Sequence, residues 1–383
     1  MKKPILFVAF SALLASCGSL ASSSVTPSSE GPKEITVTDM IGREVKVLPG
    51  SYKKVVCIGA GALRLYSYIG DVDLLSGVED IDNESLTTRP KMFDGAARPY
   101  VIAHGEKFKT LPSCGVGGPQ AQTAEAEKIL ACKPDIVVSE YEDVEKEDAL
   151  QKQLGVPVIT LKIGSSGLTN QAAFGSYELL GKVFDKAERA KALTDFVKAE
   201  TKAISDKTAA VPEDERVNAY ACGLGNWGTT NQYMTAQNYD VFNTAHINNV
   251  VTGLAKDGVQ AIDAEKFASL APSMDKMIFD AAAVKNIKGS GFDFSACAAF
   301  KTGEVYLQLP YNTYYTNLET ALINAWFSAS IAYPSLFTDF DIAKKANEVT
   351  KMFNGAELYD AMKVKPNSFG GYQKIANPTE FFK

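Results

Sequence analysis

Two stretches with the same layout decide the fold class of this chain: AEKILACKPDIVVS at Ala126–Ser139 and AEKFASLAPSMDKMIFD at Ala264–Asp280. Each begins with Ala-Glu-Lys, has a proline seven residues after its glutamate, and continues into an apolar segment typical of a β-strand. We interpret each stretch as a helix, a turn and a strand, present once in each of two lobes. The alternative is coincidence, because helices before turns that contain proline are common.

Segments on both sides of the two stretches continue the same alternation. Apolar runs that read as strands alternate with segments of helical spacing, which predicts mostly parallel sheets covered by helices on both faces. The expected strands include 53–60, 73–78, 135–139, 156–161, 216–222, a run from Lys276, and 304–309. The expected helices include 62–70, 124–132, 145–154, 239–245, a run from Ala264, 316–332 and 342–353.

One long helix is expected between the two series, at residues 185–208. Asp185 and Glu188 have the spacing of a capping box, and helix formers continue to about Lys207 before Pro212. About 22 residues at roughly 1.5 Å each are long enough to cross a small domain. The chain of 383 residues therefore divides into an N-terminal α/β lobe at 34–184, this linker helix, and a C-terminal α/β lobe at 209–383.

The N-terminus has the pattern of a targeting segment. MKKPILFVAFSALLASCG has two lysines and then an apolar run from Ile5 to Leu14, which is typical of a secretory signal and too short to span a bilayer. The ending Leu-Ala-Ser-Cys resembles a bacterial lipobox, so we expect residues 1–17 to be a lipoprotein signal and Cys17 to carry the lipid. A plain signal cleaved nearby is the alternative. Residues 18–33, rich in Ser and Pro, are expected to form a flexible tether.

Charge and residue counts exclude several function classes. There are 39 basic and 45 acidic residues, a net charge of −6, and no Lys/Arg block, which argues against nucleic acid or an anionic membrane surface as the main partner. Two histidines are too few for a metal site built from several histidines. No nucleophile motif stands out, so we predict that the chain is not an enzyme. Cys57 and Cys132 are expected to be small buried hydrophobes.

The segment GAGALR, from Gly59 to Arg64, follows a strand and precedes a helix, with Glu79 twenty residues after Gly59. This nearly fits a dinucleotide fingerprint, but Arg64 stands where the third glycine belongs, so we set a dehydrogenase aside. A glycine-rich turn at the carboxyl end of a strand still lines the crevice where open α/β sheets bind ligands. Arg64 is therefore a candidate for contact with an anionic ligand, with a surface salt bridge as the alternative.

Two aromatic segments are candidates for the remainder of a ligand site. LPYNTYYTN at Leu309–Asn317 and GNWGTTNQYMTAQNY at Gly225–Tyr239 both follow expected strands of the second lobe, so their aromatic residues are expected to converge at one sheet edge. Aromatic rings with amide neighbours give flat apolar contact together with hydrogen-bonding groups. For any single tyrosine the alternative is packing beneath the C-terminal helices. The candidate ligand-binding residues from these segments are Trp227, Tyr233, Tyr311, Tyr314 and Tyr315.

Four further motifs, in this order along the chain, add a resemblance to these features. They are TVTDMIGREV, GALRLYSYIG, AEKILACKPDIVV and LYDAMK. With the lipobox, the tether and the two lobes, the chain resembles the lipoprotein substrate-binding components of bacterial ABC importers, above all those serving ferric siderophores, haem and cobalamin. The resemblance implies a ligand cleft between the lobes, little domain closure, no intrinsic cofactor, a monomer anchored outside the cytoplasm by Cys17 alone, and a permease dimer with ATPase subunits as partner.

The same resemblance gives the repeated Ala-Glu-Lys a role. In that family one surface glutamate on each lobe docks against arginines of the permease, and the matching positions here are Glu127 and Glu265. Glu125 is a near neighbour that competes for the first assignment. The ligand stays open between a ferric siderophore, haem, a corrinoid and another small molecule, and a cell-surface enzyme or adhesin on the same scaffold is the rival of a different class.

Overall fold

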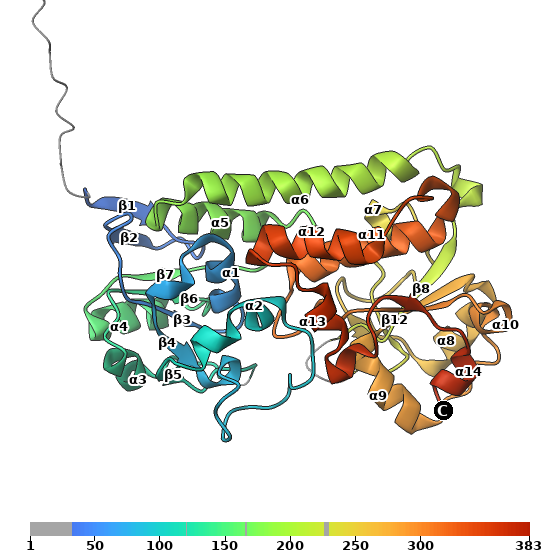
Figure 1. The fold of residues 1–383 in the computed structure, drawn as a ribbon, viewed down its shortest axis with the longest axis horizontal. Helices are drawn as coiled ribbons and strands as arrows, with labels where there is room; N and C mark the ends of the chain where they lie inside the picture. The colour runs from blue at the N-terminus through green and yellow to red at the C-terminus, as the bar shows by residue number, and fades with distance from the viewer. Residues whose placement is uncertain (1–32, 120, 165–166, 226–229) are drawn as a thin grey trace, which may run out of the picture.

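The computed structural model describes residues 33–119, 121–164, 167–225 and 230–383. The expected signal, the lipid-bearing Cys17, nearly all of the expected tether and Trp227 lie outside the described residues. The described chain forms two α/β lobes side by side, with one long helix running along both of them (Figure 1). The predicted fold class is confirmed.

The N-terminal lobe is built on a five-stranded parallel sheet in the order β5-β4-β3-β6-β7. Its strands are β3 (Val55–Ile58), β4 (Leu75–Glu79), β5 (Ser113–Gly115), β6 (Ile136–Ser139) and β7 (Val158–Thr160), preceded by the hairpin β1 (Ile35–Thr38) and β2 (Glu44–Val47). Its helices are α1 (Ala62–Ile69), α2 (Pro99–Phe108), α3 (Ala126–Ala131), α4 (Val144–Leu154) and α5 (Gln171–Val183). The strands expected here are confirmed to within a few residues.

The C-terminal lobe has a second five-stranded sheet in the order β10-β8-β12-β13-β14, parallel except for the edge strand β14. Its strands are β8 (Asn218–Cys222), β10 (Asn248–Asn249), β12 (Lys276–Asp280), β13 (Val305–Gln308) and β14 (Gln373–Lys374), and β9 (Met234–Thr235) pairs with β11 (Gln260–Ala261) beside them. Its helices are α7 (Asp240–Thr244), α8 (Ala264–Leu270), α9 (Ala281–Ser290), α10 (Ala298–Thr302), α11 (Leu318–Ala332), α12 (Ile342–Asn354), α13 (Tyr359–Lys363) and α14 (Pro378–Phe381).

The long helix is α6 (Ala187–Thr208), 22 residues that connect the two lobes. The predicted capping box is wrong: Lys186 is the N-cap residue and no side chain caps the first turn. Asp185 lies instead in the turn after α5 and has a left-handed φ of 55°. The chain needs that conformation to reverse direction between α5 and α6, and this removes Asp185 from the capping position. Glu188 remains in the first turn, where its charge favours the helix dipole.

The two lobes share a large buried contact in addition to α6. Helices α11 and α12 run beneath α6 in Figure 1, and α12 packs on α1 and α2 of the N-terminal lobe. Tyr68 of α1 donates a hydrogen bond to Glu319 of α11 at 2.5 Å and meets the ring of Phe353 edge-on at 5.0 Å. Arg189 of α6 donates to the carbonyl oxygens of Tyr68 and Met352. The carboxyl ends of both sheets are thereby held facing one another.

Candidate functional site

The candidate site lies where the carboxyl ends of the two sheets meet, beginning at the turn between β3 and α1. Gly61 is the N-cap residue of α1 and has φ 100°. A Cβ at this position would lie 2.1 Å from Ile163 Cδ1 and 2.7 Å from Arg64 Nη2, so only glycine fits. The glycine-rich turn therefore lets the backbone pass close to Arg64, as expected for a crevice-lining turn.

Arg64 is fully buried at the contact between the lobes. Its Nη1 donates to the carbonyl oxygen of Tyr314 at 2.9 Å and to Asn317 Oδ1 at 3.3 Å, and the guanidinium lies 5.6 Å from the centre of the Tyr100 ring. Nε and Nη2 are buried and have no acceptor among the described residues. The alternative of a surface salt bridge is wrong, because Arg64 is inaccessible and has no ion pair in the described chain. Buried guanidinium donors without acceptors are costly unless a ligand or water accepts from them.

Tyr314 crosses from the C-terminal lobe into the N-terminal lobe. Its hydroxyl donates to Glu79 Oε2 at 3.1 Å and accepts from the Gly118 N–H at 2.9 Å. Its ring lies 5.5 Å from the ring of Phe93, and the side chain is only 3% exposed. Together with its carbonyl bond to Arg64, Tyr314 makes three hydrogen bonds to the opposite lobe.

The loop that carries Tyr314 is strained and held from within. Tyr314 and Tyr315 are consecutive non-glycine residues with left-handed φ values of 55° and 66°. The side-chain amide of Asn317 donates to the carbonyl oxygens of Tyr311, Thr313 and Tyr315, and fixes this shape. Strained backbone that its surroundings hold in place is typical of ligand clamps and switch regions.

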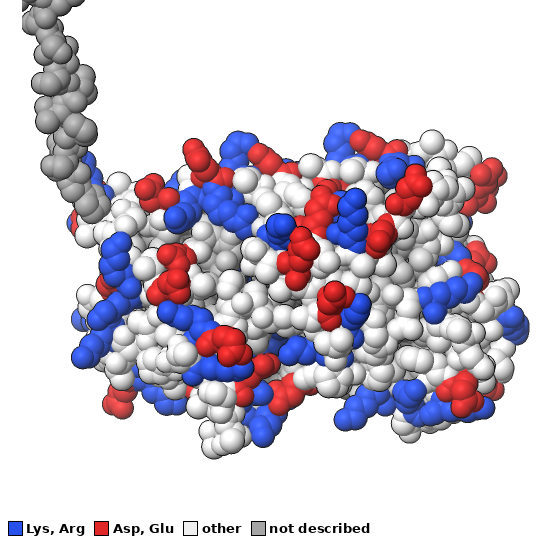
Figure 2. All heavy atoms as spheres, viewed as in Figure 1, with Lys and Arg blue, Asp and Glu red and all other residues white. Residues whose placement is uncertain are grey.

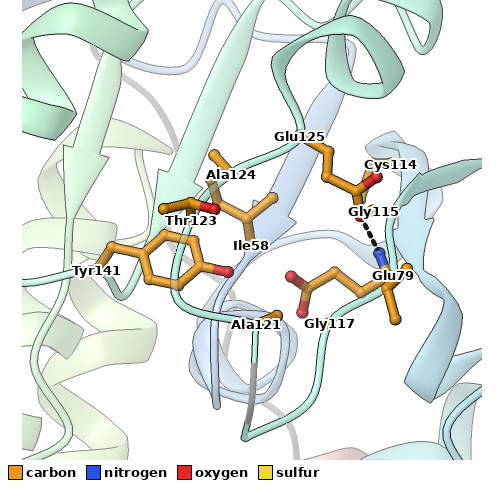
Figure 3. A pocket seen from close by; sticks show the side chains of 11 residues that line it. Ile58, Glu79, Cys114, Gly115, Gly117, Ala121, Thr123, Ala124, Glu125 and Tyr141 are labelled. Carbon is orange, nitrogen blue, oxygen red and sulfur yellow. Dashed lines mark hydrogen bonds between the residues drawn. The ribbon is translucent and has the colours of Figure 1, made fainter.

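Two further tyrosines lie at the rim of the site. Tyr315 is 44% exposed, and burial of the remainder, with the nearby charges of Glu140 and Glu142, raises its pKa. Tyr141 lines a small pocket at the carboxyl edge of the N-terminal sheet, and its hydroxyl and the Glu79 carboxylate point into the same space (Figure 3). Burial raises the pKa of Glu79 to about 7 and that of Glu140 to about 8.

The other predicted tyrosines are not brought to this contact. Tyr311 is 1% exposed in the core beside Tyr239, at 6.2 Å between ring centres. Tyr233 packs edge-on against Phe267 and Phe292 within the C-terminal lobe. Trp227 lies outside the described residues.

Sequence reasoning missed several residues of the site. Phe93, Tyr141, Glu140 and Asn317 were not singled out, and Glu79 was weighed only for a ribose contact. Glu79 and Glu140 could have been found from their positions at the carboxyl ends of strands, because Glu79 ends β4 and Glu140 directly follows β6. Phe93 comes from a long connection between β4 and α2 whose path no local pattern predicts.

The paired glutamates occupy matching exposed positions. Glu127 and Glu265 are exposed, and they lie in the first turns of α3 and α8, respectively. Figure 1 shows α3 in the N-terminal lobe and α8 in the C-terminal lobe, both apart from α6. Glu125 differs, because its Oε1 accepts from the Val116 N–H at 2.6 Å and its Oε2 pairs with Lys128 at 2.7 Å. Glu127 and Glu265 have no hydrogen-bond or ion-pair partner within the part of the chain that the structure describes.

The described surface and core add three further observations. Basic and acidic side chains are interspersed over the face in Figure 2. Among the described residues there is no group of three or more His, Cys, Asp or Glu side chains placed to hold a metal ion, and no helix long and apolar enough to cross a membrane. The five described cysteines are free and buried, which confirms the expectation for Cys57 and Cys132.

Comparison with known proteins agrees with this architecture. The family model described as "Periplasmic binding protein" matches residues 66–281. No curated protein matches the sequence significantly.

Solved structures share the fold at low identity. A periplasmic solute binding protein from Veillonella parvula is 19% identical with a TM-score of 0.66, covering 91% of this chain and 100% of that one. The molybdate periplasmic binding protein MolA of Haemophilus influenzae is 18% identical with a TM-score of 0.63, covering 84% and 98%. The periplasmic catecholate-siderophore binding protein VctP of Vibrio cholerae is 18% identical with a TM-score of 0.53, covering 79% and 100%. At such identities the likeness concerns the fold.

Proposed function

This chain belongs to the periplasmic binding protein family, and from that premise we propose that it captures a ferric siderophore, haem or a corrinoid outside the cytoplasm and delivers it to an ABC permease. Cys17 carries a lipid that anchors the chain to the membrane, and the two lobes bind the ligand between them. The partner is a permease dimer with its ATPase subunits, and the binding protein acts as a monomer.

The observation that carries this proposal is the pair of exposed glutamates, one on each lobe. Glu127 and Glu265 begin equivalent helices of the two repeated helix–turn–strand units, and no described side chain engages them. Two carboxylates presented in this way suit a two-fold symmetric partner with basic residues at matching positions. The local bonds of Glu125 favour Glu127 as the docking residue of the N-terminal lobe.

The proposed ligand contacts lie where the two lobes meet. Arg64 has buried donors without acceptors, Tyr141 lies beside Glu79, and Tyr315 presents a partly exposed ring near Glu140 and Glu142. Aromatic faces with a few convergent polar groups are the usual lining of a small-molecule site.

A charge reversal at both glutamates tests the proposal. Wild-type protein is first screened by thermal shift against ferric siderophores, haem and cobalamin, and the compound that binds is used for uptake. Glu127→Arg with Glu265→Arg should reduce uptake at least about a hundredfold, because like charges then face each other across the permease interface. Affinity for the compound should change less than about twofold, because the glutamates lie outside the cleft.

The matched control reverses exposed acids elsewhere on the molecule. Glu145 lies in the first turn of α4 and Glu213 lies after the end of α6, and both are exposed. Glu145→Arg with Glu213→Arg should transport normally. Equal loss of uptake in the control, or loss of affinity in the Glu127/Glu265 pair, would contradict the docking assignment.

A further inference from the structure

Resting on the proposed function, we propose that Tyr314 occupies a ring subsite of the ligand cleft, and that the ligand displaces it with a hydroxyaryl ring and a carboxylate of its own. Tyr314 then competes with the ligand for the site. The groups that bond to Tyr314 indicate which chemical groups the ligand carries.

The polar surroundings of Tyr314 define two ends of this subsite. At one end, Glu79 Oε2 accepts a hydrogen bond from the phenol and the Gly118 N–H donates one to it, so the fitting group is a hydroxyl that both donates and accepts. At the other end, Arg64 Nη1 donates to the Tyr314 carbonyl oxygen. A ligand with a hydroxyl at one end and an acceptor oxygen at the other satisfies the same three groups.

The space between these ends is shaped for a flat ring. The ring of Phe93 lies 5.5 Å from that of Tyr314 at an interplanar angle of 38°. Beside the phenol oxygen, the backbone runs through Gly117 and Gly118, with left-handed φ values of 65° and 94°. A Cβ on Gly117 would lie 2.8 Å from the Glu79 side chain, so the close approach of this backbone to the carboxyl group that holds the phenol requires glycine.

Arg64 favours a carboxylate over the Tyr314 carbonyl. The carbonyl oxygen uses only Nη1, and the buried Nε and Nη2 have no acceptor among the described residues. A carboxylate oxygen pair accepts two parallel hydrogen bonds from a guanidinium, and such charge-assisted bonds are stronger than a bond to a neutral carbonyl. The ligand therefore gains hydrogen bonds that Tyr314 cannot make.

The loop that carries Tyr314 also has features that allow it to leave the N-terminal lobe. Tyr314 and Tyr315 are both held in left-handed conformations, which are costly for residues other than glycine and are typical of ligand clamps and switch regions. Asn317 bonds the loop to itself through three carbonyl oxygens, so the loop can leave as a unit with Tyr314 at its tip.

The alternative role, in which Tyr314 itself contacts the ligand, predicts the opposite sign. If Tyr314 is a contact, its removal weakens binding, and if it is a competitor, its removal strengthens binding. The probes are 4-hydroxyphenylacetate, which carries both end groups, and phenylacetate, which lacks the hydroxyl. Their dissociation constants are measured by isothermal titration calorimetry with the wild-type protein and with Tyr314→Ala.

Tyr314→Ala should bind 4-hydroxyphenylacetate at least about tenfold more tightly than the wild type does, because the competing ring and hydroxyl are gone and only the backbone carbonyl still competes for Arg64. It should bind phenylacetate at least about tenfold less tightly than 4-hydroxyphenylacetate, because phenylacetate leaves Glu79 and the Gly118 N–H without a partner. Equal or weaker binding by Tyr314→Ala, or no preference for the hydroxylated probe, overturns the proposal.

A second variant guards against failure of Tyr314→Ala to fold. Tyr314→Phe keeps the ring but loses both hydroxyl bonds, so 4-hydroxyphenylacetate should displace it at least about threefold more readily than it displaces Tyr314. Backbone amides of residues 309–317 should also exchange hydrogen faster when the probe is bound. The matched control is Tyr333→Phe, which removes the hydroxyl that donates to the His246 carbonyl oxygen and should leave the probe affinity unchanged.

The outcomes separate this inference from the proposed function. If the wild-type protein binds a metal complex but the Tyr314 variants bind the hydroxylated probe no more tightly than the wild type does, the subsite is rejected and the transporter proposal stands. If the Tyr314 variants bind the hydroxylated probe more tightly and the wild-type protein binds none of the metal complexes screened, the subsite is supported and the proposed metal-complex ligand is rejected.

Discussion

The carboxyl edge of each sheet carries a buried acidic side chain, but the two side chains make different hydrogen bonds. Glu79 is the last residue of β4 and Asp280 is the last residue of β12, and both are buried carboxyl groups. Asp280 acts locally, because its Oδ1 accepts from the Ala282 N–H and caps α9. Glu79 accepts from Gly59 within its own lobe and from Tyr314 of the other lobe. The two carboxyl groups stand on strands that do not correspond, because β12 matches β6 in the repeated unit, and of the two only Glu79 bonds to a group from the other lobe.

The largest effect that tests this comparison concerns the glycines at the two edges. Gly61→Ala should lower the free energy of unfolding by about 2–5 kcal/mol, because it adds both a clash with Ile163 and left-handed strain. Gly225→Ala at the C-terminal edge should cost less than about 1 kcal/mol, since its nearest atom would lie 3.7 Å away and its φ is not left-handed. Urea unfolding followed by circular dichroism measures both, and equal losses would show that the C-terminal turn is as tightly constrained.

The two buried carboxyl groups make a smaller, pH-dependent contribution. Burial raises the pKa of both Glu79 and Asp280 to about 7, above the ordinary values of 4.5 and 3.8 for these side chains. The unfolded chain therefore loses these protons at lower pH than the folded chain does, and the stability present below about pH 4 is lost as the pH rises towards 7.

Neutral replacements measure that contribution at each edge. Glu79→Gln and Asp280→Asn should each reduce the fall of unfolding free energy between pH 4 and 7, by up to about 1.4 kcal/mol per pH unit. Only Glu79→Gln should also speed hydrogen exchange in residues 309–317, since only Glu79 bonds to Tyr314. A pH profile identical to that of the wild type in both variants would mean that neither carboxyl group stays protonated in the folded protein.

The smallest effect separates the two acids at the start of α3. Glu125→Ala should cost about 0.5–1.5 kcal/mol, because it leaves the Val116 N–H without its acceptor and Lys128 without its partner. Glu127→Ala should change stability by less than about 0.5 kcal/mol, because its carboxylate is exposed and makes no such bonds. Thermal unfolding of the two single variants gives the comparison, and a larger loss for Glu127 would reverse the assignment of structural and docking roles.

The sequence was most informative where a single segment contains the whole pattern. The helix, turn and strand expected around Pro134 and Pro272 are α3 with β6 and α8 with β12, because helical spacing and apolar strand runs are local properties. The exposed positions of Glu127 and Glu265 follow from that same local pattern. The capping box at Asp185 failed because the conformation of that residue is set by the packing of α5 against α6, which no local pattern contains.

The interior of the candidate site was less predictable, because its contacts are long-range. Arg64 and Tyr314 are 250 residues apart in sequence, and nothing near either residue identifies the other. Tyr311 and Tyr314 come from one aromatic segment, yet one packs in the core and the other enters the opposite lobe. The left-handed conformations of Tyr314 and Tyr315 decide between these fates, and tyrosine carries no local preference for that region.

The contact between α1 and the C-terminal helices also sets an order of events during folding. Tyr68 lies 251 residues before its partner Glu319, and Arg189 lies 163 residues before Met352. A chain that emerges from its N-terminus first therefore makes the whole N-terminal sheet before the helices that cover α1 exist. Until α11 and α12 arrive, the part of Tyr68 and α1 that these two helices cover remains open to solvent or to a chaperone. The first lobe is thus synthesised early but completed only by nearly the last part of the chain.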